Sequence, residues 1–277
     1  MPSVRRSSAG LVNHNSSLAR KGEGYEVRPF PKIRRAYVDV LREGSRRHII
    51  HGLVEVDVSK ARSLVAAERT GRVSFTGFIT ACVGRAVDED RMLHAHRWGR
   101  RKLVLFEDVD VNMQLEQVQT DGTRIVQSRI IRAVNRKTVR EISAEIRQAQ
   151  EVTDMDRRRY RGTIWLVTLP RAIRGLIWRL MMARPWWTKR FGGTIAVSAI
   201  GMFGSNLGWG IPITPAPLMV TVGGIGSRPV LVDGNIENRE HVSLTISVDH
   251  DIIDGAPAAR FADRLRELVE AADGLTD

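Results

Sequence analysis

A strictly alternating stretch near the C-terminal end of the chain sets the strongest constraint on its fold. Four apolar residues at every second position form one face: Val242, Leu244, Ile246 and Val248. The residues between them are polar: Ser243, Thr245, Ser247 and Asp249. This period of two is typical of a β-strand that packs one face against a core.

The residues Asp249–Gly255 connect this strand to a helix and present one histidine, His250. If the alternation continues, His250 lies on the apolar face, where burial disfavours the imidazolium and keeps the ring neutral. A neutral imidazole can accept a proton near pH 7, as a general base must. On pattern alone, Asp254 equally fits a plain helix N-cap, and His250 a hydrogen-bonded core histidine. The expected helix has Pro257 in its first turn and the apolar stripe Phe261, Leu265, Leu268 and Val269.

Composition limits the class of protein. The 277 residues are 43% hydrophobic and 27% charged, which is typical of a folded chain with a core. The single cysteine, Cys82, excludes a disulfide framework and favours a reducing compartment, so we expect a cytoplasmic protein with no secretory signal. The net charge of +12 favours anionic partners. Zinc-finger spacing, a helix-turn-helix and aromatic-rich basic repeats are missing from the sequence, so nucleic acid is not the expected partner.

The earlier part of the chain alternates helical and strand patterns. Residues 1–24 are rich in Ser, Arg and Gly and predict a flexible basic tail before a single domain, 25–277. Ser59 and Ser74 are expected to cap two helices, and Thr138 with Glu141 forms a capping box. The helices are expected at about 34–44, 60–70, 75–87 and 138–151, and the strands at 49–58, 103–106, 109–115 and 124–134, with a hairpin turn at Asp121-Gly122.

An apolar and basic segment at about 160–190 interrupts this order. Arginines and Pro170 break its apolar runs, so it is not a transmembrane span. The pattern favours a helical hairpin that is buried or covered by another subunit; a helix lying on a membrane surface is the alternative. After it, strands are expected at 194–200 and 218–222, followed by a hairpin at Asp233-Gly234.

Several motifs resemble the catalytic domain of the 2-oxoacid dehydrogenase acyltransferases. The pattern Asp249-His250-x-x-x-Asp254-Gly255 resembles its signature. Arg34–Leu41 is similar to its first helix, Leu103–Val111 to one of its strands, and Gly193–Gly204 to its segment around a serine, here Ser198. The resemblance covers about residues 30–272, except for 160–190. It implies an α/β fold like that of chloramphenicol acetyltransferase, a two-layer sandwich in which helices cover a mixed sheet.

The resemblance also implies an activity of EC 2.3.1 type. His250 would be the general base, and Ser198 would stabilise the oxyanion. Asp254, followed by Gly255, would fix the loop that carries His250 by pairing with a buried arginine. Arg34 is the candidate for that arginine. The implied substrates are an acyl-coenzyme A or carrier-protein thioester and a small acceptor. No covalent lipoyl group and no metal are expected. The motifs do not identify the residues that bind coenzyme A. Because the family builds its site between subunits, a homotrimer or higher oligomer is implied.

Two residues depart from the family pattern. Asp251 stands where the family usually has arginine, and Ala199 where it usually has asparagine. Asp251 adds a negative charge beside the base, which would raise the pKa of His250 or repel an anionic acceptor. We also expect a free-standing core, because the residues before it are too few for a lipoyl domain. These departures leave a second hypothesis open: a catalytically silent trimeric scaffold, peripheral to a membrane through residues 160–190.

Overall fold

A six-stranded mixed sheet forms the centre of the molecule. The computed structural model describes residues 20–22, 24–27, 30–68, 71–118, 124–150, 162, 165–199 and 207–275. In spatial order the strands are β3 (Ile49–Asp57), β10 (Asn235–Asp249), β9 (Leu218–Val232), β8 (Ile195–Ala199), β6 (Val111–Val118) and β7 (Arg124–Ile131). Strand β8 runs parallel to both β6 and β9, and the other pairs are antiparallel.

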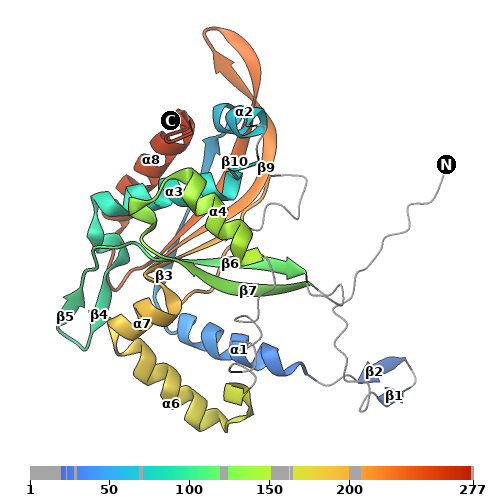
Figure 1. The fold of residues 1–277 in the computed structure, drawn as a ribbon, viewed down its shortest axis with the longest axis vertical. Helices are drawn as coiled ribbons and strands as arrows, with labels where there is room; N and C mark the ends of the chain where they lie inside the picture. The colour runs from blue at the N-terminus through green and yellow to red at the C-terminus, as the bar shows by residue number, and fades with distance from the viewer. Residues whose placement is uncertain are drawn as a thin grey trace.

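Helices cover one face of this sheet and form the core with it (Figure 1). They are α2 (Ser59–Ala67), α3 (Phe75–Glu89), α4 (Val139–Gln150) and α8 (Gly255–Ala271). The predicted apolar faces of the alternating strand and of the last helix are both buried there. Helix α3 is buried on most sides, because α4 and α8 pack against it as well as the sheet. The expected two-layer α/β sandwich with a mixed sheet is therefore confirmed.

A smaller group of elements lies at the lower end of the molecule in Figure 1. It comprises α1 (Lys32–Gly44), α6 (Arg171–Met182), α7 (Pro185–Gly192) and the hairpin of β4 (His96–Trp98) and β5 (Lys102–Val104). The described chain also has two short 3₁₀ turns, η1 (Arg91–His94) and η2 (Val134–Arg136), and a small hairpin of β1 (Arg20–Gly22) and β2 (Tyr25–Val27). Residues 1–19 and 23 of the predicted tail lie outside the described residues, as does the turn at 121–122.

Local chemistry explains where several helices begin. Ser74 accepts a hydrogen bond from the Gly77 N–H at 3.0 Å, as expected of an N-cap. The capping box of α4 is present: the Thr138 N–H donates to Glu141 Oε2, and the Glu141 N–H donates to Thr138 Oγ1. The prediction for Ser59 is wrong. Val58 occupies the N-cap position, and the Ser59 hydroxyl instead accepts from the Glu240 N–H of the neighbouring strand β10.

The β9–β10 hairpin is longer than the sequence indicated. Asp233 and Gly234 both have positive φ, 48° and 82°, as a two-residue type I′ turn requires, so the predicted turn is confirmed. Strand β9 does not stop at Val222 but continues as one strand to Val232. Gly223 allows a loop to cross the strand, because a Cβ there would lie 2.1 Å from the Gly208 carbonyl oxygen.

The described part of the segment at 160–190 forms helices whose apolar side chains are mostly not buried within this chain. Residues 162 and 165–190 of the segment are described, and most apolar side chains of α6 and α7 are exposed. Burial of this segment within the single chain is therefore not found, and its cover by another subunit stays a prediction. Among the described helices, none has the length and hydropathy needed to cross a membrane.

Candidate functional site

His250 lies on a short turn between β10 and α8. Strand β10 ends at Asp249, and the His250 N–H donates to the His48 carbonyl oxygen at 2.8 Å. The imidazole is 44% exposed. The expectation that His250 is buried on the apolar face is therefore wrong within this chain, because the strand stops one residue earlier and the alternation stops with it. An exposed imidazole is nevertheless open to a substrate.

The turn is fixed by the residue before the histidine. Asp249 is fully buried, and its Oδ2 accepts from Nη1 of Arg47 at 2.6 Å. Its backbone carbonyl accepts from the N–H groups of Ile252 and Ile253, at 2.9 and 3.0 Å. Its Oδ1 accepts from the Asp251 N–H. One buried carboxylate thus holds both the end of β10 and the turn that carries His250.

The residues that were predicted to support His250 do not hold the turn. Asp254 is 86% exposed, and its Oδ1 lies 3.7 Å from Nδ1 of His250, longer than a hydrogen bond. It occupies the N-cap position of α8 without a side-chain cap bond. Arg34 is an exposed residue of α1, and the described residues contain no ion pair between it and Asp254. The arginine that anchors the turn is Arg47, not Arg34. A Cβ at Gly255 would meet no heavy atom within 4 Å, so packing does not require glycine there.

The Asp251 carboxylate contacts two side chains, those of His48 and Arg97. His48 Nδ1 lies 2.9 Å from its Oδ1, and Arg97 Nη1 donates to its Oδ2 at 2.7 Å. The hydrogen bond from His48, with smaller contributions from the charges of His48, Arg97 and Arg47, lowers the pKa of Asp251. The carboxylate that departs from the family pattern is therefore paired with Arg97, which offsets its charge beside His250.

Ser198 lies on β8, at the end of a row of hydroxyl groups. Ile195 and Val197 face the core, so Ser198 belongs to the opposite face of the sheet. It is in register with Thr221 on β9, which is in register with Thr245 on β10. The hydroxyls of Thr221 and Thr245 are buried and have no hydrogen-bond partner within the described part of the chain. The Ser/Thr alternation on the polar face of β10 was visible in the sequence, but its continuation across three strands was not.

The structure does not bring Ser198 and His250 together within one chain. His250 is five residues beyond Thr245 along β10, about 16 Å at the rise of a strand. Ser198 is two strand spacings, about 10 Å, away across the sheet. No group of three or more His, Cys, Asp or Glu that could hold a metal is found in the described ranges.

The C-terminal third of the chain matches a family model. Residues 183–276, which include Ser198, His250 and Asp254, match the 2-oxoacid dehydrogenases acyltransferase (catalytic domain). The lipoamide acyltransferase component of the branched-chain α-keto acid dehydrogenase complex of Bacillus subtilis is 24% identical over 99% of this chain and 59% of its own length. The succinyltransferase component of the yeast Saccharomyces cerevisiae 2-oxoglutarate dehydrogenase complex is 37% identical over 28% of this chain and 17% of its own. The chain thus spans about three fifths or less of these relatives.

Solved structures share the fold over most of the chain. The dihydrolipoamide acetyltransferase of Azotobacter vinelandii has a TM-score of 0.68, with 17% identity and coverage of 100% of this chain and 99% of its own. A probable dihydrolipoamide acetyltransferase of Listeria monocytogenes has a TM-score of 0.65, with 22% identity and coverage of 91% and 97%. Chloramphenicol acetyltransferase has a TM-score of 0.50, with 13% identity and coverage of 87% and 96%. The chain therefore carries the fold of the catalytic domain of the 2-oxoacid dehydrogenase acyltransferases, and its residues 183–276 match the model of that family.

Proposed function

We propose that this protein is an acyltransferase that moves an acyl group from a coenzyme A or carrier-protein thioester to a thiol, hydroxyl or amine acceptor. The observation that carries the proposal is the presentation of His250. Its imidazole is exposed on a turn held by the ion pair of Arg47 with the buried Asp249. Rigid support of an accessible base is what acyl transfer needs, because the base must meet the acceptor in one geometry.

His250 would act on the acceptor. Asp254 lies on the Nδ1 side of the ring, which leaves Nε2 as the atom that takes the acceptor proton. The acceptor then attacks the thioester carbonyl carbon, and the carbonyl oxygen becomes an oxyanion. This attack forms the bond between the acceptor and the carbonyl carbon. Collapse of the intermediate then re-forms the carbonyl and breaks the carbon–sulfur bond. The departing thiolate recovers the proton from His250, so no net proton is gained or lost by the enzyme.

Ser198 would stabilise the oxyanion, but from a second copy of the chain. The separation of about 16 Å along the strand and about 10 Å across the sheet excludes a shared site within one chain. A neighbouring copy would place its Ser198 opposite this His250 in a homo-oligomer, in keeping with the trimer that the family resemblance implied. The hydroxyl of Ser198 would then donate to the oxyanion. We place this activity in the cytoplasm, as the single cysteine indicated.

The proposal is tested by release of free thiol from acyl-coenzyme A with a panel of thiol, hydroxyl and amine acceptors. We expect His250→Ala to lower kcat by about 10²–10⁴-fold, the usual contribution of a general base. Folding should be unchanged, because the ring is exposed. His241→Ala is the matched control, since this histidine lies on the β9–β10 hairpin and its Nδ1 contacts only the Arg239 carbonyl among the described residues.

Equal rates for the wild type and His250→Ala would remove His250 as the base. No release with any acceptor, together with no binding of acyl-coenzyme A, would favour the alternative of a silent scaffold.

A further inference from the structure

Helix α6 turns its apolar stripe toward solvent. Its residues at i, i+3, i+4 and i+7 are between 38% and 57% exposed: Ile173, Leu176, Ile177 and Leu180. The opposite side of the helix carries a buried charge. Arg174 Nε donates to Asp39 Oδ2 of α1 at 2.7 Å, and Arg174 Nη1 donates to the Leu169 carbonyl. A surface helix normally has the reverse arrangement, so the buried ion pair fixes α6 in an inverted orientation.

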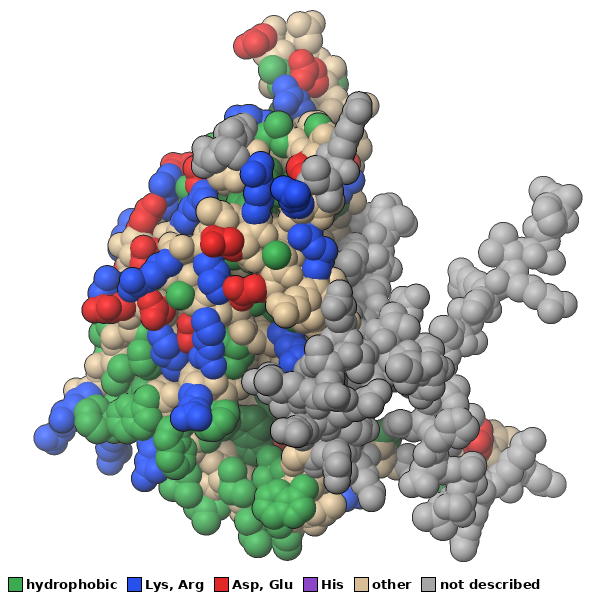
Figure 2. Space-filling view, viewed as in Figure 1, with side chains coloured by type: hydrophobic (Ala, Val, Ile, Leu, Met, Phe, Trp, Pro, Cys, Tyr) green, Lys and Arg blue, Asp and Glu red, His purple; other side chains and the backbone are tan. Residues whose placement is uncertain are grey.

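Aromatic side chains extend this stripe into one surface. Trp186, Trp187 and Phe191 of α7 are exposed, and Trp165 precedes α6. The Trp98 ring of β4 packs edge-on against Trp186, with centroids 5.3 Å apart. Figure 2 shows apolar side chains gathered at this lower end of the molecule. We call this patch of α6, α7 and the β4–β5 hairpin the α6–α7 surface.

The same surface is strongly basic. Residues 96–105 and 171–192 contain ten Lys and Arg and no Asp or Glu, and nine of the ten remain once the buried Arg174 is set aside. Several of these cations lie over aromatic rings: Lys102 over Trp98 at 4.9 Å, and Arg184 over Trp187 at 4.4 Å. Such pairs combine an apolar body with a polar end, the composition found where proteins meet a membrane interface.

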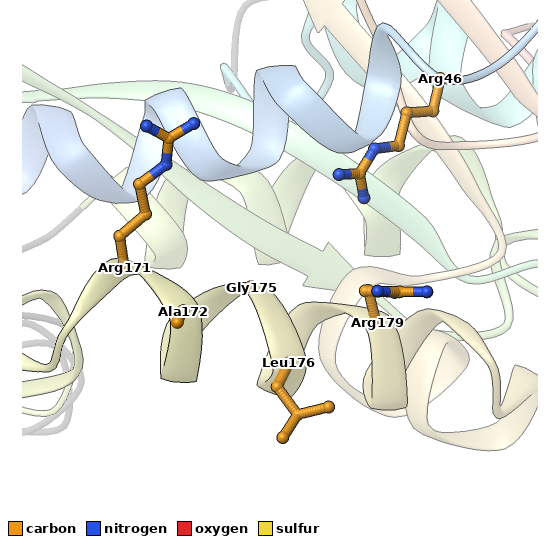
Figure 3. Close-up of a pocket in the computed structure, with 6 residues that line it drawn as sticks. All are labelled: Arg46, Arg171, Ala172, Gly175, Leu176 and Arg179. Carbon is orange, nitrogen blue, oxygen red and sulfur yellow. The ribbon is translucent and has the colours of Figure 1, made fainter.

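An open hollow of about 510 Å³ borders the stripe between α1 and α6. Three arginines line it: Arg46, Arg171 and Arg179. Figure 3 shows Arg171 reaching toward α1 and Arg46 reaching toward α6, while Leu176 points away from α1. Arg46 is paired with Glu43, but Arg171 and Arg179 have no acidic partner in the described part of the chain. Guanidinium groups grouped in this way are suited to bind phosphate.

We propose that the α6–α7 surface docks this protein onto an anionic lipid bilayer. The apolar stripe and the tryptophans enter the boundary between headgroups and acyl chains, and the surrounding arginines and lysines contact lipid phosphates. Burial of the stripe supplies the apolar part of the binding free energy, and the cations supply attraction that depends on anionic lipid. This inference does not depend on the acyltransferase activity.

The charge of the surface favours a bilayer over the same surface of a second copy of the chain. Two copies that met through the same surface would bring like charges together, because the two segments that form it contain no acidic residue. An anionic bilayer complements the charge and covers the apolar stripe at the same time.

The test is co-sedimentation of the full chain with vesicles of phosphatidylcholine alone, or of phosphatidylcholine mixed with phosphatidylglycerol. We expect binding to the mixed vesicles and little binding to phosphatidylcholine alone. Leu176→Gln with Leu180→Gln should weaken binding by about tenfold or more, because two exposed apolar side chains no longer enter the bilayer. Arg171→Glu with Arg179→Glu should weaken it to a similar extent.

Matched controls separate this surface from general stickiness and charge. Leu231→Gln with Ile236→Gln removes two exposed apolar side chains at the tip of the β9–β10 hairpin and should leave binding unchanged. Arg140→Glu with Arg260→Glu makes the same change in net charge at exposed sites away from the surface. The proposal is overturned if the wild type does not bind the mixed vesicles. It is also overturned if the Leu231/Ile236 pair weakens binding as much as the Leu176/Leu180 pair, and the Arg140/Arg260 pair as much as the Arg171/Arg179 pair. It is also overturned if the Leu176/Leu180 pair alters only the oligomeric state, which would assign the surface to an interface between copies.

Discussion

Two buried hydroxyl groups beside Ser198 are exceptions to the rule that buried polar atoms are hydrogen-bonded. Thr221 Oγ1 and Thr245 Oγ1 have no partner within the described residues. Leaving such a group unpaired costs about 1–3 kcal/mol. We therefore expect Thr245→Val, which keeps the shape of the side chain, to raise the free energy of unfolding by about 1 kcal/mol. Urea denaturation of the two proteins measures the difference.

Ser247 is the matched control for that substitution. It lies two residues further along the same face of β10 and is also buried, but its hydroxyl is 2.9 Å from Nδ1 of His51. Ser247→Ala should therefore lower the free energy of unfolding by about 1 kcal/mol. Opposite signs for the two variants would support an unpaired hydroxyl at Thr245. Destabilisation by Thr245→Val would mean that this hydroxyl has a partner in the assembled protein.

Two buried histidines, His94 at the end of η1 and His96 at the start of β4, make this part of the molecule sensitive to acid. Burial lowers the pKa of both His94 and His96 to about 4, and the charge of Lys189 also lowers that of His94. Below pH 6.5 the unfolded chain takes up protons that the folded chain does not, so stability falls as the pH falls from 6.5 to about 4. At about pH 5 the loss should be about 1–2 kcal/mol for each histidine.

Substitution by methionine isolates this contribution. His94→Met and His96→Met remove the titrating groups and leave the carboxylates of the chain in place. The free energy of unfolding, measured from about pH 8 to about pH 5, should fall less steeply in each variant than in the wild type. Parallel curves would show that other groups cause the loss in acid.

Elements whose ends depend on neighbouring residues could be predicted from the sequence. The caps at Ser74 and at Thr138 with Glu141, and the turn at Asp233-Gly234, involve residues at most three positions apart. The alternation of 242–248 likewise identified a face of β10 that is buried. Ser59 does not cap the helix, because its hydroxyl accepts a hydrogen bond from the Glu240 N–H of a strand distant in sequence. Local patterns cannot show such competition.

The support of the turn that carries His250 could not be predicted for the same reason. The anchoring ion pair joins Arg47 to Asp249, which are 202 positions apart. The motif of the first helix points to Arg34, but the register of β3 with β10 is what brings residue 47 to the end of the strand. The burial of His250 was extrapolated from the alternation, which does not report where a strand stops. In both cases the prediction needs the tertiary structure: which strands pair, and where each strand ends.

At the scale of the whole molecule, the separation of Ser198 and His250 requires an assembly if both act in one reaction. Strand register sets this separation, so no side-chain rotation removes it. A site shared between two copies predicts that one copy can supply the histidine and another the serine. This prediction concerns the oligomer alone and is independent of which acceptor is used.

Mixed oligomers test it. Ser198→Ala and His250→Ala should each have low activity. When subunits of the two variants are unfolded and refolded together, we expect activity to recover to about one quarter of the wild-type rate. The reason is that random mixing leaves about that share of the interfaces with both residues intact. Each variant refolded alone is the control, and size-exclusion chromatography with light scattering checks that the assemblies are equal in mass. If the mixture has only the mean activity of the two variants, then His250 and Ser198 do not complete one site across two copies. The sheet geometry makes recovery the expected result, since a histidine about 16 Å along β10 from the row that contains Ser198 can meet that serine only in a neighbour.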